Sequence, residues 1–306
     1  MKILITGCAG FIGYHLTQRI IKNKKFKIYG IDNLNSYYDI NLKKERLKLI
    51  KSKNKNFKFF KLDISNKKNV IHNFKKNKYD IVINLAAQAG VRYSIDNPQV
   101  YFDTNIEGFF NLLQASTENK IKHFIFASTS SVYGNNKKFP LEENFNTDNP
   151  LSFYAASKKC NEVMAYSYSN IFHLPCTALR FFTVYGPLGR PDMALYKFTN
   201  NIINNKKIEL FNYGNHFRDF TYIDDLTRYV EKIIIKIPKN KIPYEVYNIA
   251  SGKPKSLKYF VNLIEKTLQK KAKIKYLPKQ KGDVHKTHAK ISKIKSKVES
   301  QKSTDI

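Results

Sequence analysis

Tyr154 and Lys158 stand four residues apart in the segment YAASK. Residues at this spacing share one face of a helix, so the phenol and the ammonium group would lie close together. A free phenol has a pKa near ~10, and it acts as a base at neutral pH only where a positive charge stabilises the phenolate. The pair could therefore remove a proton from a substrate hydroxyl. The alternative is two unrelated surface residues, because the chain holds 20 tyrosines and 47 lysines.

A run of hydroxyl side chains, Ser128 to Ser131, precedes this segment within STSSVYG. It follows an apolar run typical of a buried strand. Hydroxyls at the end of a strand can simply cap and turn the chain. They can equally donate to a substrate hydroxyl or carboxylate. We favour the second interpretation, because ligands of parallel sheets bind at the carboxyl ends of the strands.

Three glycines, Gly7, Gly10 and Gly13, follow the first apolar run in the segment GCAGFIG. A strand, a glycine turn and a helix in this order let the backbone approach a pyrophosphate at the helix amino terminus. A glycine motif alone can mark an ordinary tight turn. Here Asp32 ends the second apolar run, where a carboxylate would accept from ribose hydroxyls and repel a 2′-phosphate. Together these residues predict an NAD site rather than an NADP site.

The elements that would position these residues alternate along the first 180 residues. Strands and helices in strict alternation predict an α/β fold, a doubly wound parallel sheet of the Rossmann type. The predicted strands are Lys2–Thr6, Lys27–Asp32, Phe57–Asp63, Ile81–Leu85, His123–Ser128 and Pro175–Arg180. The predicted helices between them are Phe11–Asn23, Asn41–Lys51, Asn66–Lys76, Pro98–Asn119 and Ser152–Ile171.

The pattern changes after Arg180 and indicates a second unit. We expect residues 1–180 to form the NAD-binding domain and residues 181–295 a smaller, interleaved α/β region for the substrate. A strand at 244–250 is expected to return to the first domain, and residues 296–306 to form a disordered tail. The lysine-rich sequence from Lys270 onward is expected to be loosely ordered. Helices are predicted at Asp192–Asn204, Asp224–Ile235 and Ser256–Leu268.

The net charge of +30 raises the question of a nucleic-acid partner. Only seven of the 54 basic residues are arginines. Proteins that recognise specific nucleic-acid sequences use the planar guanidinium group of arginine more than the ammonium group of lysine. We therefore interpret the charge as a compositional bias and expect no nucleic-acid partner, with a nucleic-acid-associated protein as the alternative.

The cysteines and histidines offer neither a disulfide framework nor a metal site. Cys8, Cys160 and Cys176 form no CxxC motif, so a reducing compartment is favoured. His285 and His288 form the only close histidine pair, and no cysteine or carboxylate cluster accompanies them. No apolar run approaches the ~18 residues of a membrane span, and the amino terminus lacks a signal-peptide core. We expect a cytoplasmic protein without a metal.

Taken together, the motifs resemble the extended short-chain dehydrogenase/reductase family, and within it the UDP-glucuronate 4-epimerases. The wider family is indicated by GCAGFIG, Asp32, the Asp63-Ile64 pair, NLAAQ, STSSVYG, YAASK and RFFTVYGP. The narrower assignment rests on QAGVRYS, GRPDMA and RDFTYIDD. The resemblance extends from residue 1 to about residue 295.

This resemblance implies roles for individual residues. It implies that Thr129 bonds O4 of the sugar, that Tyr154 is the base, and that Lys158 lowers the pKa of Tyr154 and holds the nicotinamide ribose. The residues implied to bind NAD, in addition to Tyr154 and Lys158, are Gly7, Gly10, Phe11, Ile12, Gly13, Asp32, Asn33, Asp63, Ile64, Leu85, Ala86, Ala87, Gln88 and Asn105. Those implied to bind the substrate are Arg92, Ser130, Ser131, Thr183, Arg190 and Arg218.

The function implied is NAD-dependent epimerisation at C4 of a UDP-sugar, converting UDP-glucuronate to UDP-galacturonate through a 4-keto intermediate. A UDP-glucose 4-epimerase and a 4,6-dehydratase are the alternatives among enzymes. Ser130 and Ser131 stand where a dehydratase carries an Asp-Glu pair, and serine cannot titrate usefully. The chain is also shorter at its carboxyl end than the resemblance leads us to expect, so an inactive NAD- or sugar-nucleotide-binding protein is a further alternative. The resemblance implies a homodimer through the helices Pro98–Asn119 and Ser152–Ile171.

Overall fold

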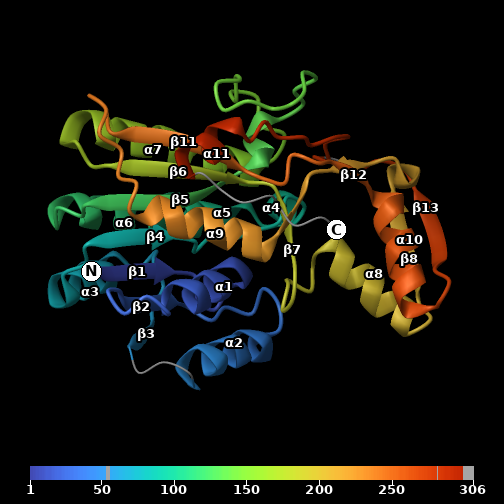
Figure 1. The fold of residues 1–306 in the computed structure, drawn as a ribbon, viewed down its shortest axis with the longest axis horizontal. Helices are drawn as coiled ribbons and strands as arrows, with labels where there is room; N and C mark the ends of the chain where they lie inside the picture. Colours follow the sequence, from blue (N-terminus) through green and yellow to red (C-terminus); the bar gives the residue numbers. More distant parts are fainter. Residues whose placement is uncertain (53–55, 281, 299–306) are drawn as a thin grey trace.

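The larger unit of the structure is built on seven parallel strands. The structure, a computed structural model, describes residues 1–52, 56–280 and 282–298. The strand order is β11-β6-β5-β4-β1-β2-β3, so the direction of winding reverses between β1 and β4 (Figure 1). This topology confirms the predicted doubly wound sheet. The strands are β1 (Lys2–Thr6), β2 (Lys27–Asp32), β3 (Phe57–Lys61), β4 (Ile81–Asn84), β5 (His123–Thr129), β6 (Cys176–Phe181) and β11 (Tyr244–Ile249).

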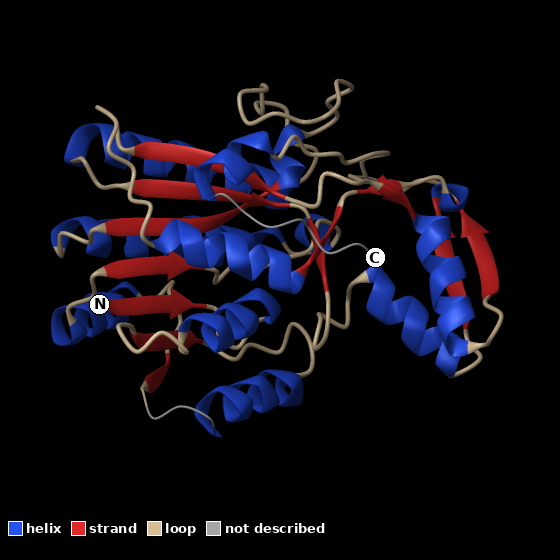
Figure 2. Cartoon of the chain, viewed as in Figure 1, coloured by secondary structure: helices blue, strands red, loops and turns tan. Residues whose placement is uncertain are grey.

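Helices cover both faces of this sheet (Figure 2). Side chains alternate along β1, so Ile3 and Ile5 pack in one core while Leu4 packs in the other. All three are fully buried, as expected for strands covered on both faces. One layer contains α1 (Phe11–Ile20), α2 (Ile40–Ser52) and α9 (Ile223–Ile234), and the other contains α3 (Lys67–Asn77), α6 (Gly108–Glu118) and α7 (Phe153–Phe172).

The helix predicted at Pro98–Asn119 is interrupted. It consists of α5 (Pro98–Tyr101), a π-helical segment η1 (Phe102–Glu107) and α6, and a short helix α4 (Tyr93–Asp96) precedes it. Within η1, the side-chain amide of Asn105 accepts from the N–H of Gln88 at 2.8 Å and donates to its carbonyl at 3.0 Å. Insertions of this kind often occur at functional sites. Here the π segment brings Asn105 to the loop that follows β4.

A smaller unit lies beyond the carboxyl ends of the strands (Figure 1). Its two strands, β8 (Lys207–Phe211) and β13 (Lys273–Leu277), pair in parallel, and α8 (Ala194–Ile203) packs on α10 (Leu257–Leu268). Ile208, Leu210 and Phe198 form its small apolar core. The expectation of loose order from Lys270 onward is wrong for β13, because this lysine-rich strand pairs with β8 along its length and Ile274 packs on that core.

Short strands carry the chain between the two units. β7 (Thr183–Tyr185) pairs with β10 (Phe220–Tyr222), and β9 (Phe217–Arg218) pairs with β12 (Lys255–Ser256). The helix α9 and the strand β11 belong to the larger unit, and so does α11 (Ser292–Val298), which packs on both. Residues 296–298 of the predicted tail are therefore helical, because Val298 is buried against this unit. The rest of that tail lies outside the described residues.

Two further short turns, η2 (Ser130–Tyr133) and η3 (Asn212–Gly214), complete the described elements. Within the ranges that the structure describes, no helix is both long enough and apolar enough to cross a membrane.

Candidate active site

A cavity of about 1730 Å³ opens between the two units at the carboxyl ends of the strands. It lies over the point between β1 and β4 where the strand order reverses, which is where open α/β sheets bind ligands. Typical small-molecule sites enclose about 300–1,000 Å³. The larger volume here leaves room for a dinucleotide and a second molecule together.

Two glycines of the turn between β1 and α1 stand where any side chain would collide with the backbone, so only glycine allows this tight turn. Gly7 has a φ of +69°, and a Cβ there would lie 2.8 Å from the backbone nitrogen of Ala86. A Cβ on Gly13 would lie 2.1 Å from the carbonyl oxygen of Gly7. No side chain caps α1 at Gly10, so the N–H groups of the first turn remain open to an anion. This cradle fits the pyrophosphate of a dinucleotide.

The carboxylate of Asp32 lies beside this cradle at the end of β2. It accepts from the backbone N–H groups of Ala9 at 3.0 Å and Leu34 at 2.9 Å. Burial raises the pKa of Asp32, and these hydrogen bonds and the charge of Lys43 oppose the rise. Each carboxylate oxygen keeps a further acceptor position. The site therefore fits the two hydroxyls of an adenosine ribose.

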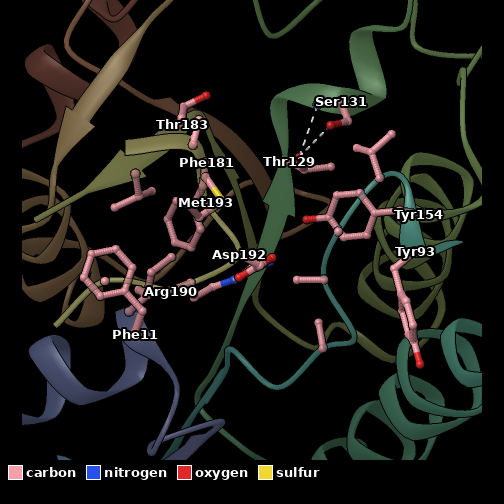
Figure 3. Close-up of a pocket in the computed structure, with 18 of the residues that line it drawn as sticks. Phe11, Tyr93, Thr129, Ser131, Tyr154, Phe181, Thr183, Arg190, Asp192 and Met193 are labelled. Atoms are coloured by element: carbon pink, nitrogen blue, oxygen red, sulfur yellow. Dashed lines mark hydrogen bonds and ion pairs between the residues drawn. The ribbon is translucent and has the colours of Figure 1, made fainter. Parts of the chain in front are cut away.

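Thr129, Tyr154 and Lys158 meet at the other side of the cavity. Thr129 ends β5, and its hydroxyl accepts from the N–H of Ser131 at 3.2 Å (Figure 3). The hydroxyl of Tyr154 points into the cavity and is hydrogen-bonded to Thr129 (Figure 3). The start of α7 is fixed by the side chain of Ser152, which accepts from the N–H of Ala155 at 3.1 Å.

Burial moves the pKa values of Tyr154 and Lys158 in opposite directions. It raises the pKa of Tyr154, against the hydrogen bond with Thr129 and the positive charge of Arg190. It lowers the pKa of Lys158 to about 8, against the negative charge of Glu162. Lys158 is therefore still charged at neutral pH, and Tyr154 needs a cation to become a base.

A buried ion pair lies behind these residues. Arg180 donates to Glu162 through Nε at 2.9 Å and through a terminal nitrogen at 2.8 Å. The hydroxyl of Ser128 donates to the same carboxylate. Glu162 stands one helical turn after Lys158, and Ser128 directly precedes Thr129. The ion pair therefore ties β5, β6 and α7 together at the point where the candidate catalytic side chains emerge.

Most of the residues predicted for the site line the cavity, but Asp63 and Asn105 do not. Asp63 instead accepts from the side-chain amide of Asn33 at 2.8 Å, and Asn105 bonds the backbone of Gln88. These two residues hold neighbours that face the cavity. The predicted residues that line it are Gly7, Gly10, Phe11, Ile12, Gly13, Asp32, Asn33, Ile64, Leu85, Ala86, Ala87, Gln88, Arg92, Thr129, Ser130, Ser131, Tyr154, Lys158, Thr183, Arg190 and Arg218.

The polar residues that line the cavity but were not predicted include Tyr37, Asp192 and His216. Within the described part of the chain, Nε2 of His216 is buried and has no hydrogen-bond partner. His216 stands two residues before Arg218, so strand alternation could have placed both side chains on one face. Asp192 stands two residues after Arg190 in the motif GRPDMA, and its carboxylate pairs with that arginine. Tyr37 is distant in sequence and gave no local signal.

Known proteins resemble this chain along nearly its whole length. Protein CapI of Staphylococcus aureus is 48% identical over 95% of this chain and 90% of its own. A UDP-glucuronate 4-epimerase of Thermodesulfobacterium geofontis is 42% identical over 95% of this chain and 88% of its own. The crystal structure of a UDP-glucuronic acid 4-epimerase from Bacillus cereus, in complex with UDP-glucuronic acid and NAD, matches with a TM-score of 0.93. It is 36% identical and covers 100% of this chain and 95% of that one.

A model of the NAD-dependent epimerase/dehydratase family matches residues 3–250. The match includes the glycine turn, Asp32, Thr129, Tyr154 and Lys158. The chain therefore belongs to the NAD-dependent epimerase/dehydratase family.

Proposed function

We propose that this chain is an NAD-dependent nucleotide-sugar epimerase that interconverts UDP-glucuronate and UDP-galacturonate. The observation that carries the proposal is that Tyr154, Thr129 and Arg190 face one another in a cavity that also holds the glycine turn (Figure 3). NAD held by the glycine turn and Asp32 would supply a hydride acceptor for C4 and a hydride donor for its reduction from the opposite face, with no net oxidation. The relatives named above support the assignment of both molecules.

The protein side of this chemistry is proton transfer at O4. Tyr154, as the phenolate, takes the O4 proton when C4 is oxidised and gives it back when C4 is reduced. Thr129 bonds O4 and holds it against the tyrosine. The charge of Arg190 opposes the pKa-raising effect of burial on Tyr154. In the proposed reaction the charge of Lys158 adds to this stabilisation of the phenolate. Asp32 and the glycine turn hold the ribose and the pyrophosphate of the cofactor.

The carboxylate of the sugar needs a partner of its own. Arg190 is the cation in the cavity that faces Tyr154, and Ser131 and Thr183 add hydroxyl donors. The 4-keto form of a uronic acid is a β-keto acid, which loses CO₂ when its carboxylate stands perpendicular to the ketone. A fixed set of donors keeps the carboxylate out of that alignment. A neutral UDP-hexose requires no such cation.

Two further arginines are placed to bind the nucleotide part of the substrate. Arg92 and Arg218 line the cavity beside the small unit, where they would bind the diphosphate. Ser130 and Ser131 follow Thr129, and neither side chain titrates near neutral pH. These two positions therefore lack the acid and base that the elimination of water by a 4,6-dehydratase would need beside Thr129.

The test is to incubate the purified protein with UDP-glucuronate and NAD⁺ and to follow the products by NMR. We expect UDP-galacturonate alone. Tyr154→Phe should abolish turnover and leave NAD binding intact, whereas Tyr213→Phe, at an exposed tyrosine outside the cavity, should behave as the wild type. Preferential turnover of UDP-glucose would contradict the substrate, and full activity of Tyr154→Phe would contradict the base. NAD binding without any turnover would favour the inactive alternative.

We also propose that the enzyme is a cytoplasmic homodimer without a nucleic-acid partner. Its three cysteines are free, which suits a reducing compartment. Exposed apolar side chains on η1, α6 and α7, among them Phe102 and Val163, support pairing of two copies through these helices. The binding partner that we propose for the cavity, besides NAD, is a UDP-sugar.

A further inference from the structure

The loop before α8 carries Arg190 and is anchored to the larger unit. Arg46, which is fully buried in α2, donates to the carbonyl of Leu188 at 2.7 Å. The ring of His15, in α1, contacts the carbonyl of Pro187 at 2.8 Å. The backbone that leads to Arg190 is therefore held by two helices of the larger unit. Any freedom of the guanidinium group must lie in its own long side chain.

That side chain is held by Asp192 (Figure 3). Nε of Arg190 donates to Oδ1 of Asp192 at 3.0 Å, and a terminal nitrogen donates to Oδ2. This is the two-point geometry in which arginine and carboxylate fix each other's orientation. Tyr37 also lies beside this guanidinium group and interacts with it, and the N–H donors of Arg190 that Asp192 does not engage can meet a ligand.

Asp192 is itself held by Tyr37, a residue of the loop that follows β2. The hydroxyl of Tyr37 donates to Oδ2 of Asp192 at 3.2 Å, and the guanidinium carbon of Arg190 lies 5.9 Å from the centre of the Tyr37 ring. A Cβ on Gly90 would lie 2.5 Å from the Tyr37 hydroxyl. Glycine at this position therefore leaves room for the Tyr37 side chain. The ring of Tyr93 packs against Tyr37 at 5.0 Å between centroids.

We propose that Asp192, held by Tyr37, is a positioning residue that sets the direction of the free edge of Arg190. The inference rests on the proposed function, in which that edge binds the carboxylate of UDP-glucuronate. With two of its donors engaged by Asp192, the guanidinium group cannot rotate about its long side chain. The substrate carboxylate then meets donors of fixed direction. Asp192 and Tyr37 thereby decide whether the 4-keto intermediate is reduced again or loses CO₂.

The two outcomes differ in atoms and electrons. In epimerisation C4 regains a hydride, O4 regains its proton and carbon is conserved. In decarboxylation the C5–C6 bond breaks, its electron pair forms the enolate across C4 and C5, and CO₂ leaves. A proton from water then adds to C5 and leaves a UDP-4-keto-pentose. C4 has not been reduced again, so one NADH accumulates for each CO₂ released. A merely structural residue would lower both fluxes without changing their ratio.

The experiment measures this ratio for Asp192→Asn, which keeps the shape of the side chain and removes its charge. UDP-galacturonate and CO₂ are quantified by NMR with substrate labelled with ¹³C at the carboxyl group, and NADH by its absorbance. We expect the ratio of CO₂ to UDP-galacturonate to rise about tenfold or more, as the loss of a charge-assisted two-point contact implies. KM for UDP-glucuronate should rise less than this ratio does.

Three companion variants make the result specific. Tyr37→Phe should raise the ratio in the same direction by a smaller factor, and Asp192→Glu should restore it in large part. Glu231→Gln breaks the Arg19–Glu231 ion pair at the surface and should leave the ratio at the wild-type value. An active wild type with an unchanged ratio in Asp192→Asn and Tyr37→Phe would overturn this inference alone. A wild type that does not convert UDP-glucuronate would overturn the proposed function, and the inference with it.

Discussion

Lys158 is the residue at which burial and charge oppose each other most directly. It is 2% exposed, and burial lowers its pKa to about 8. The proposed reaction needs Tyr154 without its proton and Lys158 with its proton. Activity should therefore rise with pH as Tyr154 ionises. It should level off as the pH passes about 8, because the loss of the lysine charge then offsets the further ionisation of Tyr154, whose pKa burial raises.

Replacing Lys158 by methionine should separate these two effects. Lys158→Met keeps most of the side-chain length and removes the charge, so the rising limb of the pH profile moves to higher pH. The levelling-off near pH 8 disappears with the group that causes it. We expect kcat at neutral pH to fall about a hundredfold or more, as for the loss of a group that activates a general base. Measurements of kcat across the pH range test this expectation.

The control for this variant is the next residue. Lys159→Met removes a lysine on another face of α7 that contacts Thr147 at 2.6 Å and does not line the cavity. Its pH profile should match that of the wild type. A Lys158→Met enzyme whose pH profile is also unchanged would show that the charge on Tyr154 is stabilised from elsewhere.

Residue type and spacing predict a side chain when its signal is local. Tyr154 and Lys158 share a helix face, and Asp32 ends an apolar run, so each could be located in the cavity from the sequence. The contact between Tyr37 and Asp192 joins residues 155 positions apart, and only the packing of the two units creates it. Asp63 and Asn105 have side chains typical of a binding site. The sequence cannot show that they bond Asn33 and Gln88 instead of lining the cavity.

At the scale of elements, His123 joins β5 to the neighbouring strand and helix. It is fully buried, with Nε2 2.8 Å from the hydroxyl of Thr177 in β6 and Nδ1 3.2 Å from the carbonyl of Ile234 in α9. Burial lowers its pKa to about 4. The folded protein therefore holds this imidazole in the neutral form throughout the physiological range.

This histidine should make stability depend on pH in mildly acidic solution. The pKa is lower in the folded than in the unfolded protein, so the unfolded state takes up the proton first as the pH falls. Its contribution is complete above the usual histidine pKa of about 6.5 and is lost on approach to pH 4. Wild type should lose about 3 kcal/mol more of its unfolding free energy than His123→Gln between these limits. Urea denaturation at several pH values measures the difference.

His72→Gln is the matched control, because His72 is exposed on α3. This variant should lose stability with falling pH as the wild type does. If His123→Gln does the same, another group is responsible for the loss of stability in acid.

Long buried elements could be predicted, and short or irregular ones could not. The strands of the main sheet are apolar runs such as Ile81–Asn84, in which every residue is buried, so composition alone reveals them. β7, β9, β10 and β12 contain two or three residues each and exist only because the two units bring them together. The π segment η1 has the same apolar pattern as an α-helix. Its extra residue per turn depends on the contacts of Asn105 with Gln88.

At the scale of the whole molecule, charge and apolar surface act against each other. A net charge of +30 keeps copies of the chain apart unless an apolar face offsets the repulsion. Such a face spans α6 and α7, where Phe110 is 37% exposed, Val163 55% and Phe172 53%. The rings of Phe110 and Tyr168 lie 6.4 Å apart, so the exposed side chains of the two helices adjoin. Burying this apolar surface between two copies would remove it from water, and this would stabilise a dimer.

Replacing Phe110 and Val163 together by glutamate should therefore produce a monomer. The change places two charges in the proposed contact and leaves the buried faces of both helices intact. Ile235→Glu, which adds a charge at a side chain 61% exposed beyond the end of α9, should leave the oligomeric state unchanged. Light scattering after size-exclusion chromatography measures the mass of each variant. A monomeric wild type, or a double variant that remains dimeric, would contradict pairing through these helices. Since the glycine turn and Asp32 lie in one chain and line one cavity, we expect the monomer still to bind NAD.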